Sequence, residues 1–191
     1  MTRTPRFHLP DELLIGYAHG ALEEAEALLV AVHASLCPIC AGKVDAFERM
    51  GGALLSAEPA AGVGDDLLAR TLAQLDALPA VAPEKPLPKD PVFPAPLVRL
   101  IGTYADIPWK RALPNVLVYD LPMRLAGVPV RLRRFDAGSN IPLHTHSAPE
   151  HDLILTGGVT DNRSGDHMLR GDVSCNDERH AHTLKIDEGE E

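Results

Sequence analysis

The stretch that decides the fold of the second half of the chain runs from Gly138 to Gly157 and reads GSNIPLHTHSAPEHDLILTG. Alternate residues of a β-strand point to the same face, so we expect His144 and His146 to face one side together. Pro149 marks a bend, after which Glu150 returns on the next strand. Two imidazoles and a carboxylate that converge inside a barrel form a site for a divalent metal.

Short β-rich runs surround this stretch from about residue 116 onward, and Gly, Asp and Asn turns separate them. The predicted strands are Val116–Tyr119, Val128–Phe135, Ile141–His146, Asp152–Thr156 and a stretch around Val173. Short strands at this spacing indicate a small antiparallel sandwich or barrel.

The spacing G-x5-H-x-H-x3-E-x6-G resembles the first motif of the cupin family at every defined position. The second cupin motif, G-x5-P-x-G-x2-H, reaches His182 when it is counted from Gly171. Its Pro and Gly positions are Asp177 and Arg179, so this motif is degenerate, and His180 is an alternative to His182.

The cupin resemblance implies an all-β barrel that holds zinc or another divalent metal. The implied ligands are His144, His146, Glu150 and His182. A polar barrel interior without a metal remains an alternative. The chain ends nine residues after His182, and the acidic stretch 185–191 offers no obvious closing strand. We therefore expect a barrel that is possibly incomplete at its C-terminal end.

The first half is rich in Ala and Leu at helical spacing. Four helices are predicted: Pro10–His19, Leu22–Leu36, Pro38–Leu55 and Asp65–Leu78. Seven prolines follow between Pro79 and Pro96, and because each disfavours helix at the preceding residue, an extended linker is predicted there. The expected fold class is α+β in two domains, an all-α domain over 1–78 and an all-β domain over 97–191.

The helical half contains a second set of metal-ligand residues. His33 and Cys37 are four apart and share a helix face, and Cys37-Pro-Ile-Cys40 places two thiols at the start of the next helix. The positive end of that helix should lower the thiol pKa. A closed zinc site needs four ligands, and His8 is the candidate for the fourth. A redox Cys-x-x-Cys pair and inert core cysteines are the alternatives.

Composition limits the function. The chain has 191 residues, 45% of them hydrophobic, and a net charge of −9, which argues against disorder and against nucleic acid as a direct partner. No apolar run approaches the roughly 18 residues needed to span a membrane. The N-terminus has no apolar signal-peptide core, so a cytoplasmic protein without a membrane partner is expected.

His-x3-Cys-x2-Cys after an upstream His resembles the zinc-binding anti-sigma domain, and the whole order of segments resembles the ChrR-type anti-sigma factors. This resemblance implies a non-enzymatic inhibitor of an extracytoplasmic-function sigma factor, whose cupin domain responds to singlet oxygen or related oxidants. The implied partner-binding face is Leu67, Leu68, Leu72 and Leu75. A homodimer through the cupin domain is possible.

Two other functions stay open at this point. A metal-dependent cupin enzyme, such as a dioxygenase, would use the same His and Glu ligands for Fe, Mn or Ni. A two-zinc structural adaptor would bind some other protein. Against the enzyme, no further acid, base or substrate-binding cluster can be recognised beside the ligands, so the anti-sigma interpretation is preferred.

Overall fold

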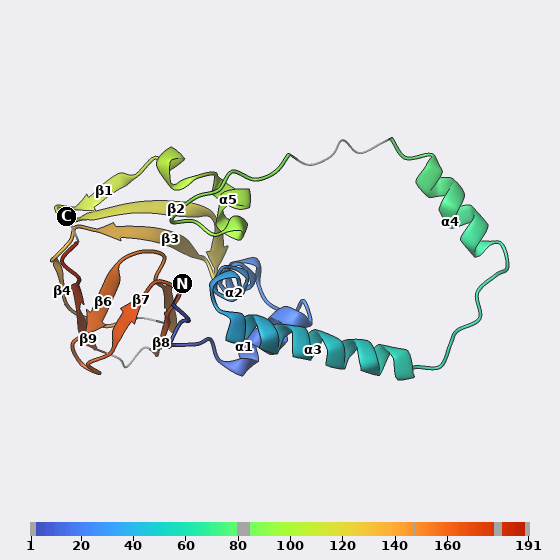
Figure 1. Cartoon of the computed structure of the whole chain (residues 1–191), viewed down its shortest axis with the longest axis horizontal. Coiled ribbons are helices and arrows are strands. Elements are labelled where there is room, and N and C mark those ends of the chain that lie inside the picture. The colour runs from blue at the N-terminus through green and yellow to red at the C-terminus, as the bar shows by residue number, and fades with distance from the viewer. Residues whose placement is uncertain (1–2, 80–84, 147, 178–180, 190–191) are drawn as a thin grey trace.

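The computed structural model describes residues 3–79, 85–146, 148–177 and 181–189 (Figure 1). Helices occupy the first part of the chain and antiparallel strands the second, as the α+β prediction requires. The four helices of the first part are α1 (Asp11–Ala18), α2 (Glu24–Leu36), α3 (Pro38–Ala57) and α4 (Leu67–Asp76). We call residues 3–76 the helical region and residues 110–189 the β region.

The break between α2 and α3 falls on one residue. Cys37 has extended backbone angles (φ −117°, ψ 103°), and the two helices meet there at 120°. Pro38 then takes the first position of α3, where its missing N–H is not needed and its fixed φ suits a helix. This corner places the end of α2 and the first turn of α3 side by side, which is the geometry that the metal ligands need.

A fifth helix, α5 (Ala95–Ile101), lies at the end of the segment that was predicted to be a linker. The reason is the position of two prolines: Pro94 precedes the helix and Pro96 lies in its first turn, where proline is favoured. A 3₁₀ turn, Tyr104–Asp106, follows. The proline-rich segment thus ends in a helix that packs against α2.

The strands of the described residues form three antiparallel sheets. Their bounds are β1 (Lys110–Leu113), β2 (Val116–Leu125), β3 (Val128–Phe135), β4 (Asn140–His144), β5 (Glu150–Leu153), β6 (Gly158–Asp161), β7 (His167–Leu169), β8 (Val173–Asn176) and β9 (His182–Ile186). The sheet orders are β1-β2-β3, β4-β9-β6-β7 and β5-β8. Strand β9 pairs with both β4 and β6, and His144 lies opposite His182 in that register. The sequence offered no obvious strand in the stretch 185–191, but β9 begins at the motif histidine and extends to Ile186.

The two regions share hydrophobic cores. One cluster joins Val32 of α2 to Phe93, Leu97 and Val98 around α5, and to the strand residues Leu121, Met123 and Leu132. A second cluster joins residues of α1–α3 to Val173 of β8. The helices α1–α3 therefore pack directly against the strands (Figure 1).

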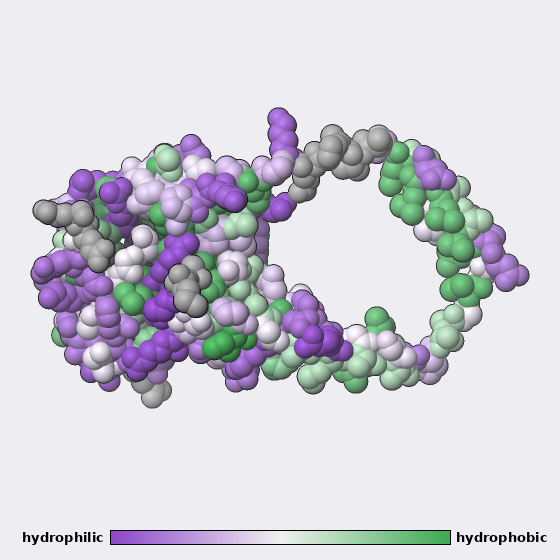
Figure 2. Space-filling model, in the orientation of Figure 1, coloured by the Kyte–Doolittle hydropathy of each residue, from purple (hydrophilic) through white to green (hydrophobic). Residues whose placement is uncertain are grey.

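Helix α4 differs from the others because none of its described residues is buried. Its leucines give it an apolar face that is exposed to solvent (Figure 2). Among the described residues no single helix is long and apolar enough to cross a membrane, and α2 with α3 meets that test only as a bent pair.

Replacement of Leu97 tests the packing of α5. Leu97 is 3% exposed, so Leu97→Ala should lower the free energy of unfolding by about 2–5 kcal/mol. Leu113→Ala makes the same change at a side chain that is 59% exposed and should cost less than about 0.5 kcal/mol. Urea denaturation of both variants measures the difference, and equal stabilities would contradict this packing.

Candidate metal centres

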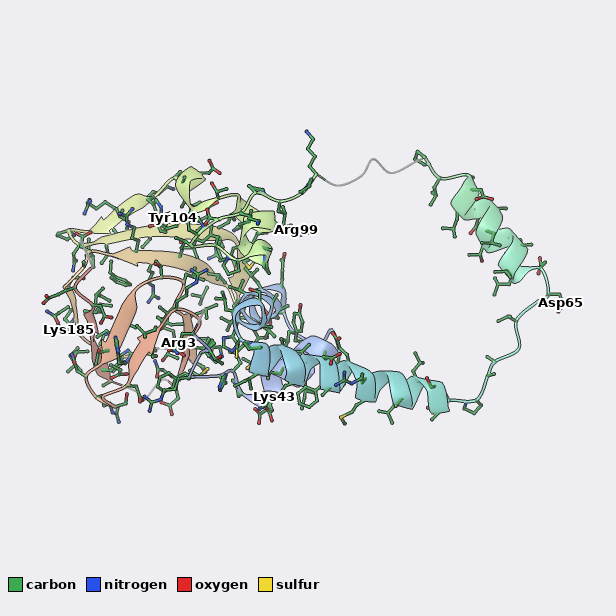
Figure 3. The ribbon with its side chains drawn as sticks, viewed as in Figure 1. Arg3, Lys43, Asp65, Arg99, Tyr104 and Lys185 are labelled. Atoms are coloured by element: carbon green, nitrogen blue, oxygen red, sulfur yellow. The ribbon has the colours of Figure 1, made fainter. Side chains whose placement is uncertain are left out.

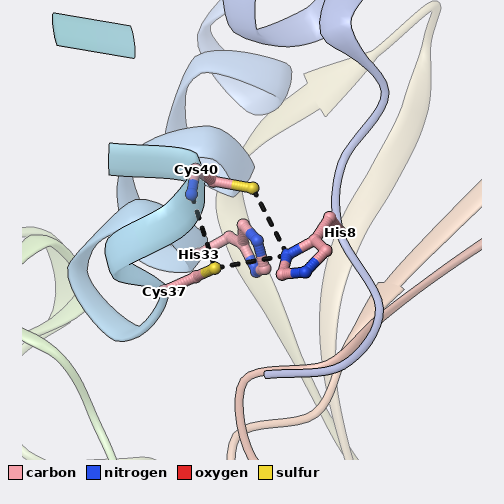
Figure 4. A group of neighbouring side chains, drawn as sticks. All are labelled: His8, His33, Cys37 and Cys40. Carbon is pink, nitrogen blue, oxygen red and sulfur yellow. Dashed lines mark hydrogen bonds between the residues drawn. The ribbon is translucent and has the colours of Figure 1, made fainter. Parts of the chain in front are cut away.

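The first group of ligand residues converges at the α2–α3 corner (Figure 4). His33 comes from the last turn of α2, Cys37 from the break and Cys40 from the first turn of α3, while His8 comes from the segment before α1. The Nδ1 atom of His8 lies 3.3 Å from Sγ of Cys37 and 3.6 Å from Sγ of Cys40. One candidate ligand atom from each of the four residues lies within 4.8 Å of the others.

Three of the four residues are buried, and His8 is partly exposed. His33, Cys37 and Cys40 have no exposed surface. Nδ1 of His33 donates to the carbonyl oxygen of Gly171 at 2.9 Å, and Nε2 has no hydrogen-bond partner among the described residues. A buried nitrogen without a partner costs free energy, which a bound metal ion would offset.

The pKa of the Cys40 thiol differs from the expectation that the start of α3 would lower it. Burial first, and then the neighbouring thiol of Cys37, raise the pKa of Cys40 to about 11 rather than lowering it. Burial also lowers the pKa of His33, so its imidazole stays neutral at pH 7. Two thiolates and two neutral imidazoles are a preferred ligand set for zinc, and Zn²⁺ would balance their charge. These residues fit a closed structural zinc site.

The second group lies in the β region. His144 on β4, His146 just after it and His182 on β9 bring their Nε2 atoms together: His182 Nε2 lies 3.1 Å from that of His144 and 3.1 Å from that of His146. His182 is 2% exposed, so the group sits against the interior of the β region. Three imidazoles on one centre suit zinc, iron, copper or nickel.

Each of these imidazoles is held at its other nitrogen. His144 Nδ1 donates to the carbonyl of Pro142 (2.9 Å), His182 Nδ1 contacts Asp161 Oδ2 (2.9 Å) and His146 Nδ1 contacts Glu150 Oε2 (3.0 Å). An acceptor at Nδ1 fixes the tautomer that leaves a lone pair on Nε2. Three lone pairs then face a common point, which is the arrangement that a cation stabilises.

Glu150 is the predicted ligand that does not join this group. Its carboxylate lies between Nδ1 of His146 and the guanidinium of Arg133, which it meets at 2.9 Å. Burial alone would raise the pKa of Glu150, but the charge of Arg133 lowers it, so Glu150 stays ionised. It supports His146 rather than facing the three Nε2 atoms. His180, the alternative to His182, lies outside the described residues.

Three polar residues beside the histidines were missed by the sequence reasoning. Asp152 shares the β5 face of Glu150, and burial together with the charge of Glu150 raises its pKa to about 7. The i, i+2 spacing could have revealed it. Nothing in the local sequence marks Arg133 or Asp161. Asp161 reaches the site because β6 pairs with β9, and Arg133 comes from β3, a strand of another sheet.

The predicted partner-binding leucines do not take part in either group. All four lie on α4, and their exposed fractions are 42% (Leu67), 70% (Leu68), 51% (Leu72) and 57% (Leu75). They form the exposed apolar face of a helix that has no buried residue.

The helical region thus combines a His–Cys ligand group with an exposed leucine helix, and the β region that follows contains a histidine group. Comparison with descriptions of known protein families gave no match. The chain is 33% identical over 190 residues to the anti-sigma-E factor ChrR of Cereibacter sphaeroides, which covers 97% of this chain and 86% of that protein. It also resembles the crystal structure of Rhodobacter sphaeroides SigE in complex with the anti-sigma ChrR, with a TM-score of 0.81, 33% identity and coverage of 97% and 95% of the two chains.

The chain therefore belongs to the ChrR family of anti-sigma factors. The prediction that it is a regulator and not an enzyme is confirmed by this membership. The cupin-enzyme alternative is set aside.

Removal of the two clustered thiols tests the first metal centre. Cys37→Ser with Cys40→Ser should lose about one equivalent of zinc per chain and lower the melting temperature, because the metal contributes folding free energy. Cys175→Ser is the matched control, since Cys175 is exposed and lies apart from both groups. Zinc content and thermal unfolding of the purified proteins give the answer; unchanged zinc in the double variant would refute the centre.

Replacement of Asp161, whose carboxylate contacts Nδ1 of His182, tests the second metal centre. Asp161→Asn should weaken metal binding there about 10–100-fold, the usual effect of losing such a partner. Asp120→Asn, which breaks an exposed ion pair with Arg131, should leave it unchanged. Cobalt titration separates the two centres, because only the cysteine group gives thiolate-to-cobalt absorption. Equal non-thiolate cobalt affinity in both variants would show that Asp161 does not support the metal.

Proposed function

We propose that this protein is a zinc-dependent anti-sigma factor, which holds an extracytoplasmic-function sigma factor and releases it under oxidative stress of the singlet-oxygen type. Its helical region is the sigma-binding domain, stabilised by zinc on His8, His33, Cys37 and Cys40. Its β region is a cupin-like sensor domain with a second divalent metal. The protein acts in the cytoplasm.

The observation that carries this proposal is the likeness to ChrR along nearly the whole chain, including the SigE complex. The four-residue group supports the zinc requirement, because its ligand types match a closed zinc site and three of its four members are buried. The acidic balance of the helical half, six basic and twelve acidic residues before position 86, suits a partner with basic surfaces.

Exposed apolar side chains on α3 and α4 support a binding mode in which these two helices contact the sigma factor. Helix α4 and the C-terminal half of α3, with Met50 (61% exposed) and Leu54 (71% exposed), leave large apolar side chains in solvent. Figure 2 shows this apolar surface along α4. Contiguous exposed apolar side chains mark protein-interaction surfaces. A sigma factor enclosed between α3 and α4 would bury them.

The proposed sensing of oxidants is supported by the three clustered histidines and by the carboxylates that contact the Nδ1 atoms of two of them. A metal held by imidazoles, or the imidazoles themselves, is a site at which an oxidant can act. Loss of one ligand would leave buried polar atoms without partners, which destabilises the surrounding strands. Such a local change could weaken the inhibitory complex.

The leucine face gives the direct test. Leu68→Ala with Leu72→Ala should weaken binding to the extracytoplasmic-function sigma factor at least about 10-fold, since central apolar contacts dominate interface energies. Both metal centres and the thermal stability should stay unchanged, because these side chains are exposed. Leu113→Ala with Leu143→Ala is the control, as both are exposed leucines of the β region.

The measurement is the dissociation constant of the purified pair. Wild-type affinity of the α4 variant would remove α4 from the interface. Failure of the unaltered protein to retain any sigma factor on co-expression would overturn the anti-sigma proposal as a whole.

A further inference from the structure

The turn between β7 and β8 connects the β region to the metal group of the helical region. Its residue Gly171 presents a carbonyl oxygen 2.9 Å from Nδ1 of His33. A carbonyl can only accept, so Nδ1 carries the hydrogen and Nε2 keeps its lone pair. The second nitrogen of this imidazole is the one that has no other partner and faces the thiols.

The next residue of the turn holds the segment that carries His8. Asp172 is completely buried, and its Oδ1 accepts hydrogen bonds from the backbone N–H groups of Arg6 (2.5 Å) and Phe7 (3.1 Å). The side chain of Arg3 forms an ion pair with the same carboxylate. Figure 3 shows Arg3 beside β8, between the strands and the first helices. Asp172 thus fixes the two residues that directly precede a candidate ligand.

This carboxylate is built to stay charged. Burial alone would raise the pKa of Asp172, but hydrogen bonds from Leu169, Phe7 and Arg6 and the charge of Arg3 lower it below its ordinary value. A buried carboxylate that accepts several N–H groups is costly to disturb, because removal of a partner leaves the others desolvated and unpaired.

The turn also needs a close approach between the two segments. Gly171 has φ +89°, and a Cβ atom at this position would lie 2.8 Å from Cγ of Pro5. Only glycine lets the backbone reach His33 and the N-terminal segment together. The contact is therefore specific to this turn and is not general packing.

We propose that the β7–β8 turn is a positioning element for the helical metal centre, in which Gly171 orients His33 and Asp172 orients the segment of His8. The inference rests on the proposed zinc occupancy of that centre. Two of its four ligands are held from the helical corner, and the other two take their orientation from the β region. Any change that shifts this turn loosens both imidazoles at once.

This arrangement supplies a route from the β region to the sigma-binding region. Metal binding to the helical centre favours the docked turn, and by reciprocity undocking of the turn weakens metal binding there. Partners of metal-bound imidazoles typically contribute 10–100-fold to metal affinity. A displacement of β7 and β8 would therefore change the orientation of His33 and His8, without any contact between the two metal centres.

The test is a cobalt titration of the full chain with Asp172→Asn. Thiolate-to-cobalt absorption reports the helical centre alone, since the histidine group has no sulfur. We expect the apparent affinity of this centre to fall about 10-fold or more, while the non-thiolate cobalt is bound as in the unaltered protein. Unchanged thiolate-site affinity would overturn the proposal.

Asp106→Asn is the control. Asp106 also accepts a backbone N–H group, that of Thr103, but it lies in the 3₁₀ turn Tyr104–Asp106 and not beside the β7–β8 turn or the metal group. An equal loss of cobalt affinity in this control would mean general destabilisation and would also overturn the proposal.

A milder variant covers the case in which Asp172→Asn does not fold. Arg3→Gln removes the charge that faces Asp172 from a side chain that is 38% exposed. It should lower the thiolate-site affinity in the same direction, by about 2–5-fold, with unchanged far-ultraviolet circular dichroism. No change in this variant would then contradict the role of the turn.

Failure of the positioning role can be distinguished from failure of the anti-sigma proposal. If the unaltered protein binds no sigma factor but Asp172→Asn weakens cobalt, the anti-sigma proposal fails and the positioning role stands. If sigma binding holds but cobalt affinity is unchanged by the variant, only the positioning role fails.

Discussion

The buried ligand group at the α2–α3 corner is the constraint on which the rest of the helical region depends. His33, Cys37 and Cys40 are fully enclosed, and His8 closes the remaining side. Enclosed thiols and an imidazole nitrogen without a partner are unfavourable in a small hydrophobic core, and a cation among them reverses the sign of that contribution. Helices α1–α3 have few buried apolar side chains of their own, so a bound metal ion would stabilise their arrangement.

The same enclosure ties the helical region to the strands. The imidazole of His33 and the segment before His8 both form hydrogen bonds with the β7–β8 turn. Val173 of β8 packs in the hydrophobic core of α1–α3. Helix α4 is left outside this assembly with its leucines exposed. The molecule therefore combines a contact between the two regions at the β7–β8 turn with an exposed apolar helix, α4.

The sequence predicts contacts between residues that are close along the chain better than contacts between distant segments. His33, Cys37 and Cys40 could be placed together because helical periodicity and a proline corner are local properties. His144, His146 and His182 followed from the motif spacing. The orientation of Glu150 could not, because Arg133 arrives from a neighbouring strand and competes for its carboxylate. Gly171 is marked only as the first position of the second cupin motif, and Asp172 is not marked at all. Their contacts with His33 and with the segment before His8 could not be predicted, since they exist only after α2 and the N-terminal segment dock on the β region.

The zinc K-edge absorption spectrum of the purified protein tests the central claim most directly. A site made by two cysteines and two histidines predicts zinc–sulfur distances of about 2.3 Å together with zinc–nitrogen distances of about 2.0–2.1 Å. The sulfur contribution should disappear in the Cys37→Ser, Cys40→Ser variant and persist in Cys175→Ser. A spectrum of the unaltered, zinc-loaded protein with nitrogen and oxygen neighbours alone would contradict the account.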